Sequence, residues 1–444
     1  MSNKNIEFKD SGIPWIGQIP KHWEVTKIKY CLKENFGGCW GDDLENEQIS
    51  QNSRLCIRVA DFDFDKQKVK QTADTFRNYT KSQILSTKLQ DGDLIIEKSG
   101  GGDKMPVGRS VVFEQNLFGA KEVLFANFCQ CFRPLNINNK FFAHAMKAFY
   151  QNNNMRFFFN QTTGIQNLSI FNILNAFLPY PPLNEQKEIV EFLDKKCEII
   201  DKRLSNLERK IKSLKEYKKS LISECVTKGL NPKNMEFKDS GISWCPQIPS
   251  DWQVINPKIL FKQRNQKAKS GEIQYTASQE FGIISQEEYT RKTGYNMVKV
   301  LKGFDILKHV EVGDFVISMR SFQGGLEYSN VSGSISSAYV MLIPNSKFVN
   351  NRYFRWLFKS SKYIDALQST TNLIRDGQAM RYSNFALIKL IVPPLNEQKE
   401  IAEFLDKKCE KIDRLNENYT KQITALKEYK KSLIYECVTG KKEI

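Results

Sequence analysis

The sequence predicts an α+β protein in which two mixed α/β globules are joined by two long helices that pair as a coiled coil. One observation is a duplication, because PPLNEQKEI at Pro181–Ile189 returns letter for letter at Pro393–Ile401. Another is that each copy opens a long run with apolar residues at coiled-coil spacing. The segments before these runs mix strand-like and helical stretches and differ between the copies. At 444 residues the chain is also long enough for two or more domains.

The repeat extends well beyond nine residues. A head segment at Glu7–Val25 returns with few changes at Glu236–Val254, and a tail at Leu214–Thr227 returns at Leu426–Thr439. The chain is therefore two copies of one unit that meet near residue 230. Two copies are fewer than the three or so that a solenoid needs, so a pseudo-two-fold pair within one chain is the better interpretation.

Each shared tail is predicted to be one long helix. The proline pair excludes helix before it, Asn184 can cap the first turn, and Glu185 suits the positive end of the helix dipole. From Asn184 to Thr227 such a helix would extend about 66 Å at ~1.5 Å per residue.

Apolar residues follow one another along these helices at alternating steps of four and three, which is the spacing of a coiled-coil seam. The step is broken at Lys218, and Asn416 stands where the first copy has Leu204, a substitution that can fix register. Two amphipathic helices docked separately on their own globules are the alternative, but the stripe is long and narrow, which favours pairing. The predicted seam residues are Leu193, Ile200, Leu204, Leu207, Ile211 and Leu214, and in the second copy Leu405, Ile412, Asn416, Ile423, Leu426 and Leu433.

The two globules have the same order of predicted elements but different amino-acid sequences. A strand-like run follows a Gly-Asp turn at Asp91–Gly102 and again, within Val312–Gly325, in the second copy. Aromatic helical stretches come next, at Asn138–Asn152 and Asn350–Ile364. A glycine-containing turn and a last apolar strand then lead into each proline pair, so both globules are expected to be mixed α/β.

Charge and composition narrow the class of partner. Lysine and arginine number 66 against 50 acidic residues, a net charge of +16, which favours a polyanion: nucleic acid first and an anionic membrane surface second. The N-terminal segment lacks the apolar core of a signal peptide, and apolar runs such as Ala338–Pro344 fall far short of the ~20 residues of a membrane helix. A cytoplasmic protein with reduced cysteines is expected, and the three scattered histidines give a metal site no support.

Together, the head DSGIPWIGQIPKHW, the run GDLIIEKSGGG and the phrase PPLNEQKEI resemble the specificity subunit of type I restriction–modification systems. The resemblance covers nearly the whole chain. It implies two target-recognition domains that read the halves of a split site in double-stranded DNA, held by two helices in an antiparallel coiled coil. Two DNA methyltransferase subunits and restriction (translocase) subunits would assemble around it, and the subunit itself would have no catalytic residue, metal or cofactor. The expected boundaries are 1–183 and 231–395 for the recognition domains and 184–230 and 396–444 for the helices.

Basic and amide residues on the glycine-bearing loops are the predicted DNA contacts. Arginine suits guanine, asparagine and glutamine suit adenine, and lysine and serine more often hold phosphates. A solvated basic loop is the alternative at each position. The predicted contacts are Lys98, Ser99, Lys104, Arg109, Gln166 and Asn167 in the first copy and Arg320, Ser321, Gln323, Arg375, Gln378 and Arg381 in the second.

Other motifs and another class of function were weighed against this interpretation. The run at Gly100–Lys104 lacks the spacing of a phosphate-binding loop. The run at Asp61–Lys66 begins like a calcium loop, but Lys66 stands where glycine is required and Thr72 where glutamate is, so a half-buried strand is favoured. The aromatic run at Met155–Asn160 is expected to pack in the core rather than on bases. The function of another class is a coiled-coil scaffold that joins two protein-binding domains, with the basic charge incidental.

Overall fold

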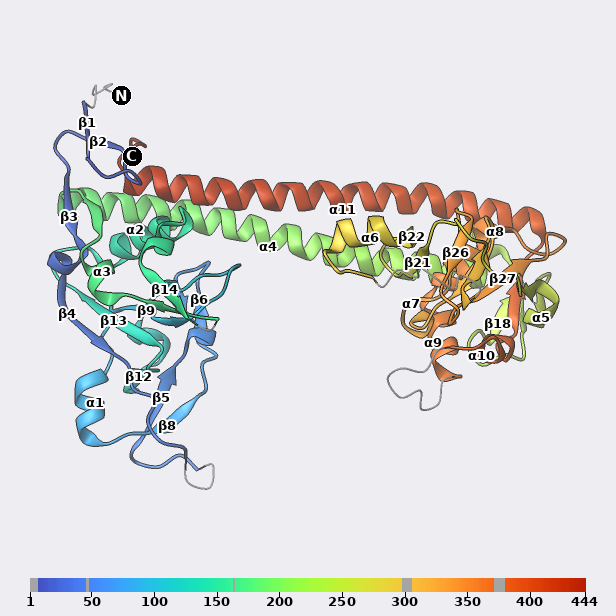
Figure 1. Ribbon diagram of the computed structural model, residues 1–444, viewed down its shortest axis with the longest axis horizontal. Helices are drawn as coiled ribbons and strands as arrows, with labels where there is room; N and C mark the ends of the chain where they lie inside the picture. The colour runs from blue at the N-terminus through green and yellow to red at the C-terminus, as the bar shows by residue number, and fades with distance from the viewer. Residues whose placement is uncertain (1–6, 45–47, 163, 298–305, 371–379) are drawn as a thin grey trace. The chain divides into compact units, whose positions relative to one another are not determined.

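The computed structural model describes residues 7–44, 48–162, 164–297, 306–370 and 380–444. The chain divides into two compact units, one formed by Met1–Asn206 with Lys421–Ile444 and the other by Leu207–Thr420 (Figure 1). Both cuts fall inside the long helices, so each unit contains one globule and part of each helix. The division into four segments at residues 183, 230 and 395 stays a prediction.

The first unit is organised around a sheet of order β4-β13-β9-β11-β7-β6. Its strand β9 (Leu94–Glu97) is buried at every residue and pairs antiparallel with both β13 (Cys129–Pro134) and β11 (Ser110–Val112). One face packs against the sheet β12-β5-β8, with Ile95 and Phe125 in the shared core. The remaining strands are β1 (Phe8–Asp10), β2 (Gln18–Pro20), β3 (Glu24–Lys27), β4 (Leu32–Gly37), β5 (Ser53–Ile57), β6 (Phe62–Asp63), β7 (Lys68–Val69), β8 (Phe76–Asn78), β10 (Ser99–Gly100), β12 (Val123–Phe125), β14 (Phe159–Thr162), β15 (Ile165–Leu168) and β16 (Phe177–Tyr180).

Helix α2 (Asn139–Gln151) packs between this sheet and the long helix α4 (Leu183–Lys228) (Figure 1). Asn138 caps α2, because its Oδ1 accepts hydrogen bonds from the backbone N–H groups of the first turn at 3.0 and 3.1 Å. The apolar face of α2 lies in one core with Leu94 of β9 and Leu193 of α4. The other short helices of this unit are α1 (Lys81–Thr87), α3 (Ile170–Leu174), η1 (Ile28–Cys31), η3 (Val59–Asp61), η4 (Gln115–Leu117) and η5 (Asn154–Phe157).

The second unit is organised around a sheet of order β20-β27-β24-β25, covered by helices α8 (Asn351–Lys359) and α9 (Ser361–Ser369). The aromatic stretch predicted as one helix is therefore two, because Ser360 between them is extended, at φ −70° and ψ 142°. Its strands are β17 (Phe237–Asp239), β18 (Gln247–Pro249), β19 (Gln253–Ile255), β20 (Phe261–Gln263), β21 (Tyr275–Ser278), β22 (Gly282–Ser285), β23 (Lys308–Val310), β24 (Phe315–Ile317), β25 (Glu327–Tyr328), β26 (Gly333–Ile335), β27 (Val340–Pro344) and β28 (Leu390–Val392). The other helices are η6 (Pro232–Asn234), α5 (Pro257–Leu260), α6 (Gln286–Thr293), α7 (Ser321–Gly324) and α10 (Tyr382–Ala386).

The two long helices pair antiparallel within each unit. The first part of α4 shares a unit with the last part of α11 (Leu395–Val438), and the last part of α4 shares a unit with the first part of α11. In the first unit Asp201 pairs with Lys430, and in the second Asp413 pairs with Lys218. These are equivalent positions of the repeat, so the apparent break in the heptad spacing is an ion pair between the helices. The predicted antiparallel coiled coil and internal repeat are confirmed.

Contacts at the start of each long helix explain why PPLNEQ is written twice. Glu185 accepts a hydrogen bond from the indole N–H of Trp23 in the head at 2.8 Å, and Glu397 accepts the same bond from Trp252 at 2.8 Å. The next residue, Gln186, is fully buried; it donates to the carbonyl of Pro181 and accepts from the N–H of the residue that caps α2, both at 2.8 Å. The phrase is thus the junction where the head, the globule and the long helix meet.

Candidate nucleic-acid interface

Strand β10, which leads into the glycine-containing loop after Gly100 (the glycine loop), forms one small sheet with the hairpin of β14 and β15, of order β10-β15-β14. Ser99 of β10 lies opposite Asn167 of β15, and on the other side Asn167 lies opposite Asn160 of β14. Directly opposed residues point to the same face of a sheet. Asn160 and Asn167 are exposed and Ser99 is half-buried, so polar side chains from three strands lie abreast on a face open to solvent.

Lys104 lies in the loop that follows β10, and glycine is required there for a close approach of two backbone segments. Gly101 has φ of +64°, and a Cβ at this position would lie 2.6 Å from the backbone nitrogen of Val107. The N–H of Met105 donates to the carbonyl of Gly102 at 3.1 Å, which closes the tip. Lys104 is exposed at this tip, where its ammonium group can reach a phosphate.

Two of the residues predicted to contact DNA hold this loop from inside. The guanidinium of Arg109 donates to both carboxylate oxygens of Glu97, at 2.8 and 2.9 Å, and this hydrogen bonding raises the pKa of Arg109. Gln166 is buried, and its Oε1 accepts the N–H of Val107 at 3.1 Å. Lys98, Ser99, Lys104 and Asn167 remain on or near the surface.

Asn160 and Phe128 belong to this surface but were not among the predicted contacts. The carbonyl of Phe128 accepts the N–H groups of Lys98 and Ser99 at 2.7 and 3.1 Å, and its ring is exposed. Asn160 ends a run of aromatic residues that was expected to pack in the core. The signal that could have identified it is the turn glycine at Gly164, because a hairpin that turns there can pair Asn160 with Asn167.

In the second unit the predicted residues lie on two loops. Arg320 directly precedes α7, and Gln323 is the third residue of this helix. Both side chains are exposed. Ser321 between them is fully buried and its hydroxyl accepts the N–H of Ser318 at 2.8 Å, so it shapes the loop. Arg381 is exposed just before α10. Arg375 and Gln378 lie outside the described residues.

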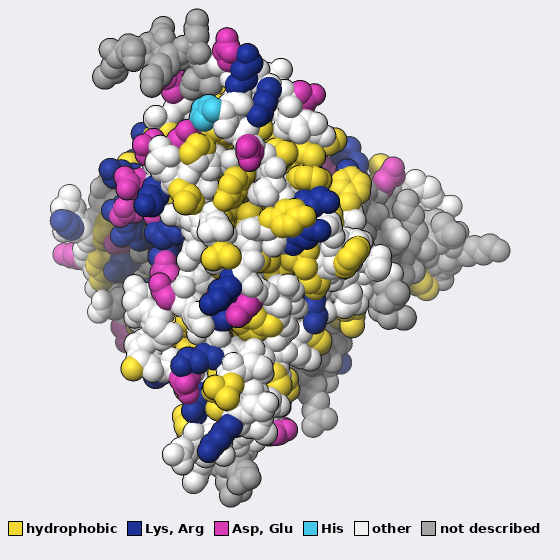
Figure 2. All heavy atoms as spheres, turned by 90° about the vertical axis from the view of Figure 1, so that its left-hand side faces the viewer, with side chains coloured by type: hydrophobic (Ala, Val, Ile, Leu, Met, Phe, Trp, Pro, Cys, Tyr) yellow, Lys and Arg dark blue, Asp and Glu magenta, His cyan; other side chains and the backbone are white. Residues whose placement is uncertain are grey.

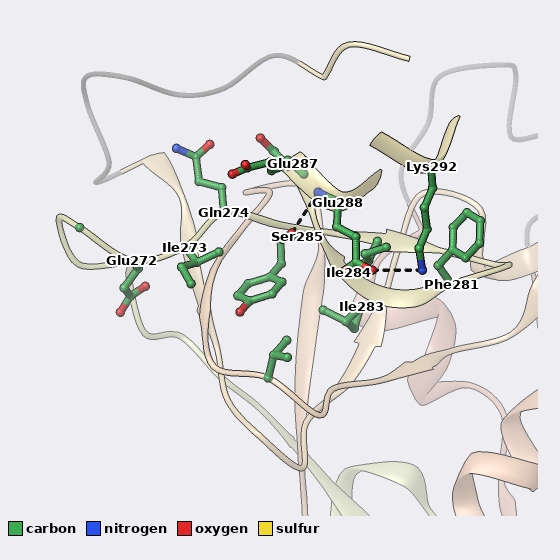
Figure 3. Close-up of a pocket in the computed structure, with 14 residues that line it drawn as sticks. Glu272, Ile273, Gln274, Phe281, Ile283, Ile284, Ser285, Glu287, Glu288 and Lys292 are labelled. Carbon is green, nitrogen blue, oxygen red and sulfur yellow. Dashed lines mark hydrogen bonds and ion pairs between the residues drawn. The ribbon is translucent and has the colours of Figure 1, made fainter. Parts of the chain in front are cut away.

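The second unit also has a pocket of about 670 Å³ beside the hairpin β21–β22 and helix α6 (Figure 3). Its charged lining is mainly acidic, because it contains Glu272, Glu287 and Glu288 but only one described basic residue, Lys292, which pairs with Glu288 at 3.1 Å. Glu272, also in the lining, is bonded to His309 Nδ1 at 2.9 Å. This lining does not favour phosphate, so the pocket is not part of the candidate interface.

The side of the first unit where β3 and α3 lie shows hydrophobic side chains together with lysines and acidic residues (Figure 2). Tyr30 of η1 and Phe171 of α3 are exposed, and the Lys29 ammonium lies 5.1 Å from the centre of the Tyr30 ring. Basic side chains on this side are therefore interspersed with acidic and hydrophobic ones. A surface that binds the phosphate backbone of DNA would instead be expected to cluster its basic residues.

The predicted seam residues of the helices differ in burial along the chain. Leu193, Ile200, Leu207, Leu405, Ile412 and Leu433 are buried, and Leu204, Ile211, Leu214, Asn416, Ile423 and Leu426 are half-buried. Charged residues dominate the positions between them. No helix in the described part of the chain combines the length and apolar character needed to cross a membrane. The same residues contain no cluster of three or more His, Cys, Asp or Glu side chains placed to bind a metal ion.

Comparison with known proteins identifies the family to which this architecture belongs. The model of the type I restriction modification DNA specificity domain matches residues 63–214 and 249–425. The chain belongs to this family. It is a specificity subunit with two DNA-recognition domains, one in each copy of the repeat.

Curated specificity subunits are similar to this chain in sequence, and solved structures share its fold. The putative type I restriction enzyme MjaX specificity subunit of Methanocaldococcus jannaschii is 23% identical, over 96% of this chain and 95% of its own length. The EcoBI specificity subunit of Escherichia coli is 22% identical over 68% of this chain and 65% of its own length. A chain solved in work on complex assembly and conformational transition of a type I system matches at a TM-score of 0.68, with 14% identity over 95% of this chain and 98% of that chain. The HsdS subunit of Thermoanaerobacter tengcongensis matches at 0.52, with the same 14% identity and the same coverage of 95% and 98%.

Proposed function

We propose that this specificity subunit reads a bipartite, asymmetric site in double-stranded DNA, one half with each unit, and carries no catalytic activity of its own. The observation that supports it is the contrast between the two parts of the repeat. The two ends of the long helices and their junctions are nearly identical, whereas the middle of the helices and the loops and sheets that present polar side chains differ. Different reading surfaces recognise different half-sites, so the site as a whole is not a palindrome.

In the first unit the proposed contacts are Lys98, Ser99, Lys104 and Asn167, with Arg109 and Gln166 supporting the loop on which they stand. In the second unit they are Arg320, Gln323 and Arg381, with Ser321 supporting its loop. Arg375 and Gln378 are proposed on the sequence alone. Lysines on such loops hold phosphates, whereas the amides and arginines reach base edges.

The repeated ends of the two long helices supply the basis for partner binding. Because the ion pairs Asp201–Lys430 and Lys218–Asp413 occupy equivalent positions, the helix surfaces around them repeat. A repeated surface can bind two copies of one partner in equivalent ways. We therefore propose that two DNA methyltransferase subunits bind the helices and that restriction subunits join the resulting complex.

Co-expression of the chain with candidate methyltransferase subunits, followed by mapping of methylated bases in the host genome, tests this function. The expected result is methylation at two short, different sequences separated by unread bases. Methylation of a contiguous palindrome would contradict the two-reader arrangement. Absence of any sequence-dependent binding would favour a scaffold of protein-binding domains instead. Methyltransferase or nuclease turnover that follows the purified chain through a sizing column would contradict the absence of catalysis.

A further inference from the structure

The exposed face of the sheet β10-β15-β14 has a chemistry of its own beyond that of a basic surface. Its central residues are two amides, Asn160 and Asn167, directly opposed on neighbouring antiparallel strands. Opposed Cβ atoms in such pairs are about 4.5–5.5 Å apart. Two strands about 4.8 Å apart fit within a major groove about 12 Å wide, which admits a β-ribbon.

We propose that this face reads an adenine–thymine pair in the major groove through Asn160 and Asn167. The inference rests on the proposed function, because it names the base chemistry that the first unit recognises. An asparagine amide can donate to adenine N7 and accept from the adenine N6 amino group at the same time.

The amide of Asn167 is held in place for such a contact. The Ser99 hydroxyl donates to Asn167 Oδ1 at 2.7 Å. A carbonyl oxygen has two lone pairs, so Oδ1 retains one acceptor position and Nδ2 keeps both of its hydrogens. The neighbouring residue Gln166 points inward, which anchors β15 and leaves Asn167 on the outward face. An amide whose orientation is fixed before binding loses less entropy when it contacts a base.

Arginine, the usual reader of guanine, is absent from the described strands β10, β14 and β15 that form this face. Arg109 is bound at both ends of its guanidinium group to Glu97, whose side chain is 1% exposed. Arg156 belongs to η5, outside the three strands, and its guanidinium lies 4.8 Å from the centre of the Phe157 ring. The amides are therefore the groups presented for bidentate contact, and amides match adenine rather than guanine.

Apolar and basic residues complete the surface. Ile165 is two positions from Asn167 on the same strand and is 54% exposed, so it can contact a thymine methyl group. Phe128, whose backbone holds β10, is 57% exposed. Lys104 is exposed at the tip of the neighbouring loop, where lysine can hold a phosphate, and Asp103 is the exposed acidic residue of the same loop.

The test uses the full chain assembled with its methyltransferase subunits and a duplex of the mapped target. Asn160→Ala and Asn167→Ala are compared with the wild type and with Asn116→Ala, an exposed asparagine on η4 outside this sheet. Each A·T pair of the first half-site is replaced in turn, and 7-deazaadenine is used to remove N7 alone. Thermal unfolding of each variant confirms that it is folded.

The wild type and Asn116→Ala should lose affinity about 5- to 150-fold when one particular A·T pair is replaced, and they should also bind the 7-deaza duplex more weakly. Asn167→Ala should bind the natural target more weakly and no longer distinguish either change, with Asn160→Ala acting at the same pair or the next. Equal loss of affinity for all sequences would show phosphate contact and overturn the inference, as would unchanged discrimination in both variants. A wild-type complex with no sequence preference would contradict the proposed function itself.

Discussion

Replacing Lys430 by alanine is expected to lower the free energy of unfolding of the first unit by about 2–3 kcal/mol. The Lys430 ammonium donates to both oxygens of Asp201, at 2.7 and 2.9 Å, and to the carbonyl of Asp65 at 3.3 Å. It therefore ties helix α11 both to α4 and to the loop after β6. Its side chain is 11% exposed and that of Asp201 is 32% exposed.

The magnitude follows from this burial. Breaking a fully buried ion pair by removing one partner costs roughly 3–5 kcal/mol, because the other charge stays unpaired. Asp201 is about one-third exposed, so water restores part of that loss. Lys218→Ala is the matched control, because Lys218 occupies the equivalent position of the repeat and its partner Asp413 is 59% exposed. That substitution should cost about 1 kcal/mol or less.

Urea unfolding of the full chain, followed by tryptophan fluorescence and circular dichroism, measures both variants under one set of conditions. Asp201→Ala and the double variant with Lys430→Ala complete a double-mutant cycle, and the coupling should account for most of the loss. Equal costs for Lys430→Ala and Lys218→Ala, or a coupling near zero, would refute the assignment of stability to burial of the pair.

Three further predictions concern pH and salt. Burial, reinforced by the charge of Lys430, lowers the pKa of Lys147 from 10.5 to about 8, so the unfolded chain binds more protons between these values. Stability should therefore rise by up to about 3 kcal/mol over that pH window, and urea titrations of Lys147→Met should lack this rise. Burial opposes protonation of His309, but hydrogen bonds to Glu311 and Glu272 raise its pKa. Its stabilisation of the second unit should be complete below pH about 6.5 and lost as pH rises through the raised pKa; an equal pH profile of thermal unfolding in His309→Gln would contradict this. Lys104→Ala should weaken binding to all DNA sequences alike and reduce the slope of log affinity against log salt by about 0.9; a change confined to one base position would argue against a phosphate contact.

The repeat architecture could be predicted because it depends on residue patterns that are local in the sequence. Heptad spacing predicted both long helices, and the proline pairs marked where they begin. Asn184 was expected to cap the first of them, but α4 already begins at Leu183, so Asn184 lies inside its first turn. Lys218 was recognised only as a break in the spacing. Its partner Asp413 is nearly two hundred positions away in the chain, so the ion pair becomes visible only once the helices are known to run antiparallel.

The loop conformation could be predicted from the sequence, but the roles of its residues could not. Glycine at Gly101 reflects a backbone constraint, whereas the contact of this loop with DNA stays a prediction. Whether Gln166 or Asn167 faces solvent depends on the register of β15 against β10, which the local sequence does not specify. Arg109 was predicted to contact DNA from its charge alone. Its pairing with Glu97 comes from the antiparallel strands β9 and β11, whose adjacency is a property of the sheet.

The claim that each unit reads its own half-site is tested most directly by exchanging one reader. Residues 26–180 are replaced by the corresponding segment of a related specificity subunit, and methylated bases are mapped in cells that express the same methyltransferase subunits. One half-site should change to that of the donor while the other half remains as in the wild type. A site changed in both halves, or changed in neither, would contradict the account.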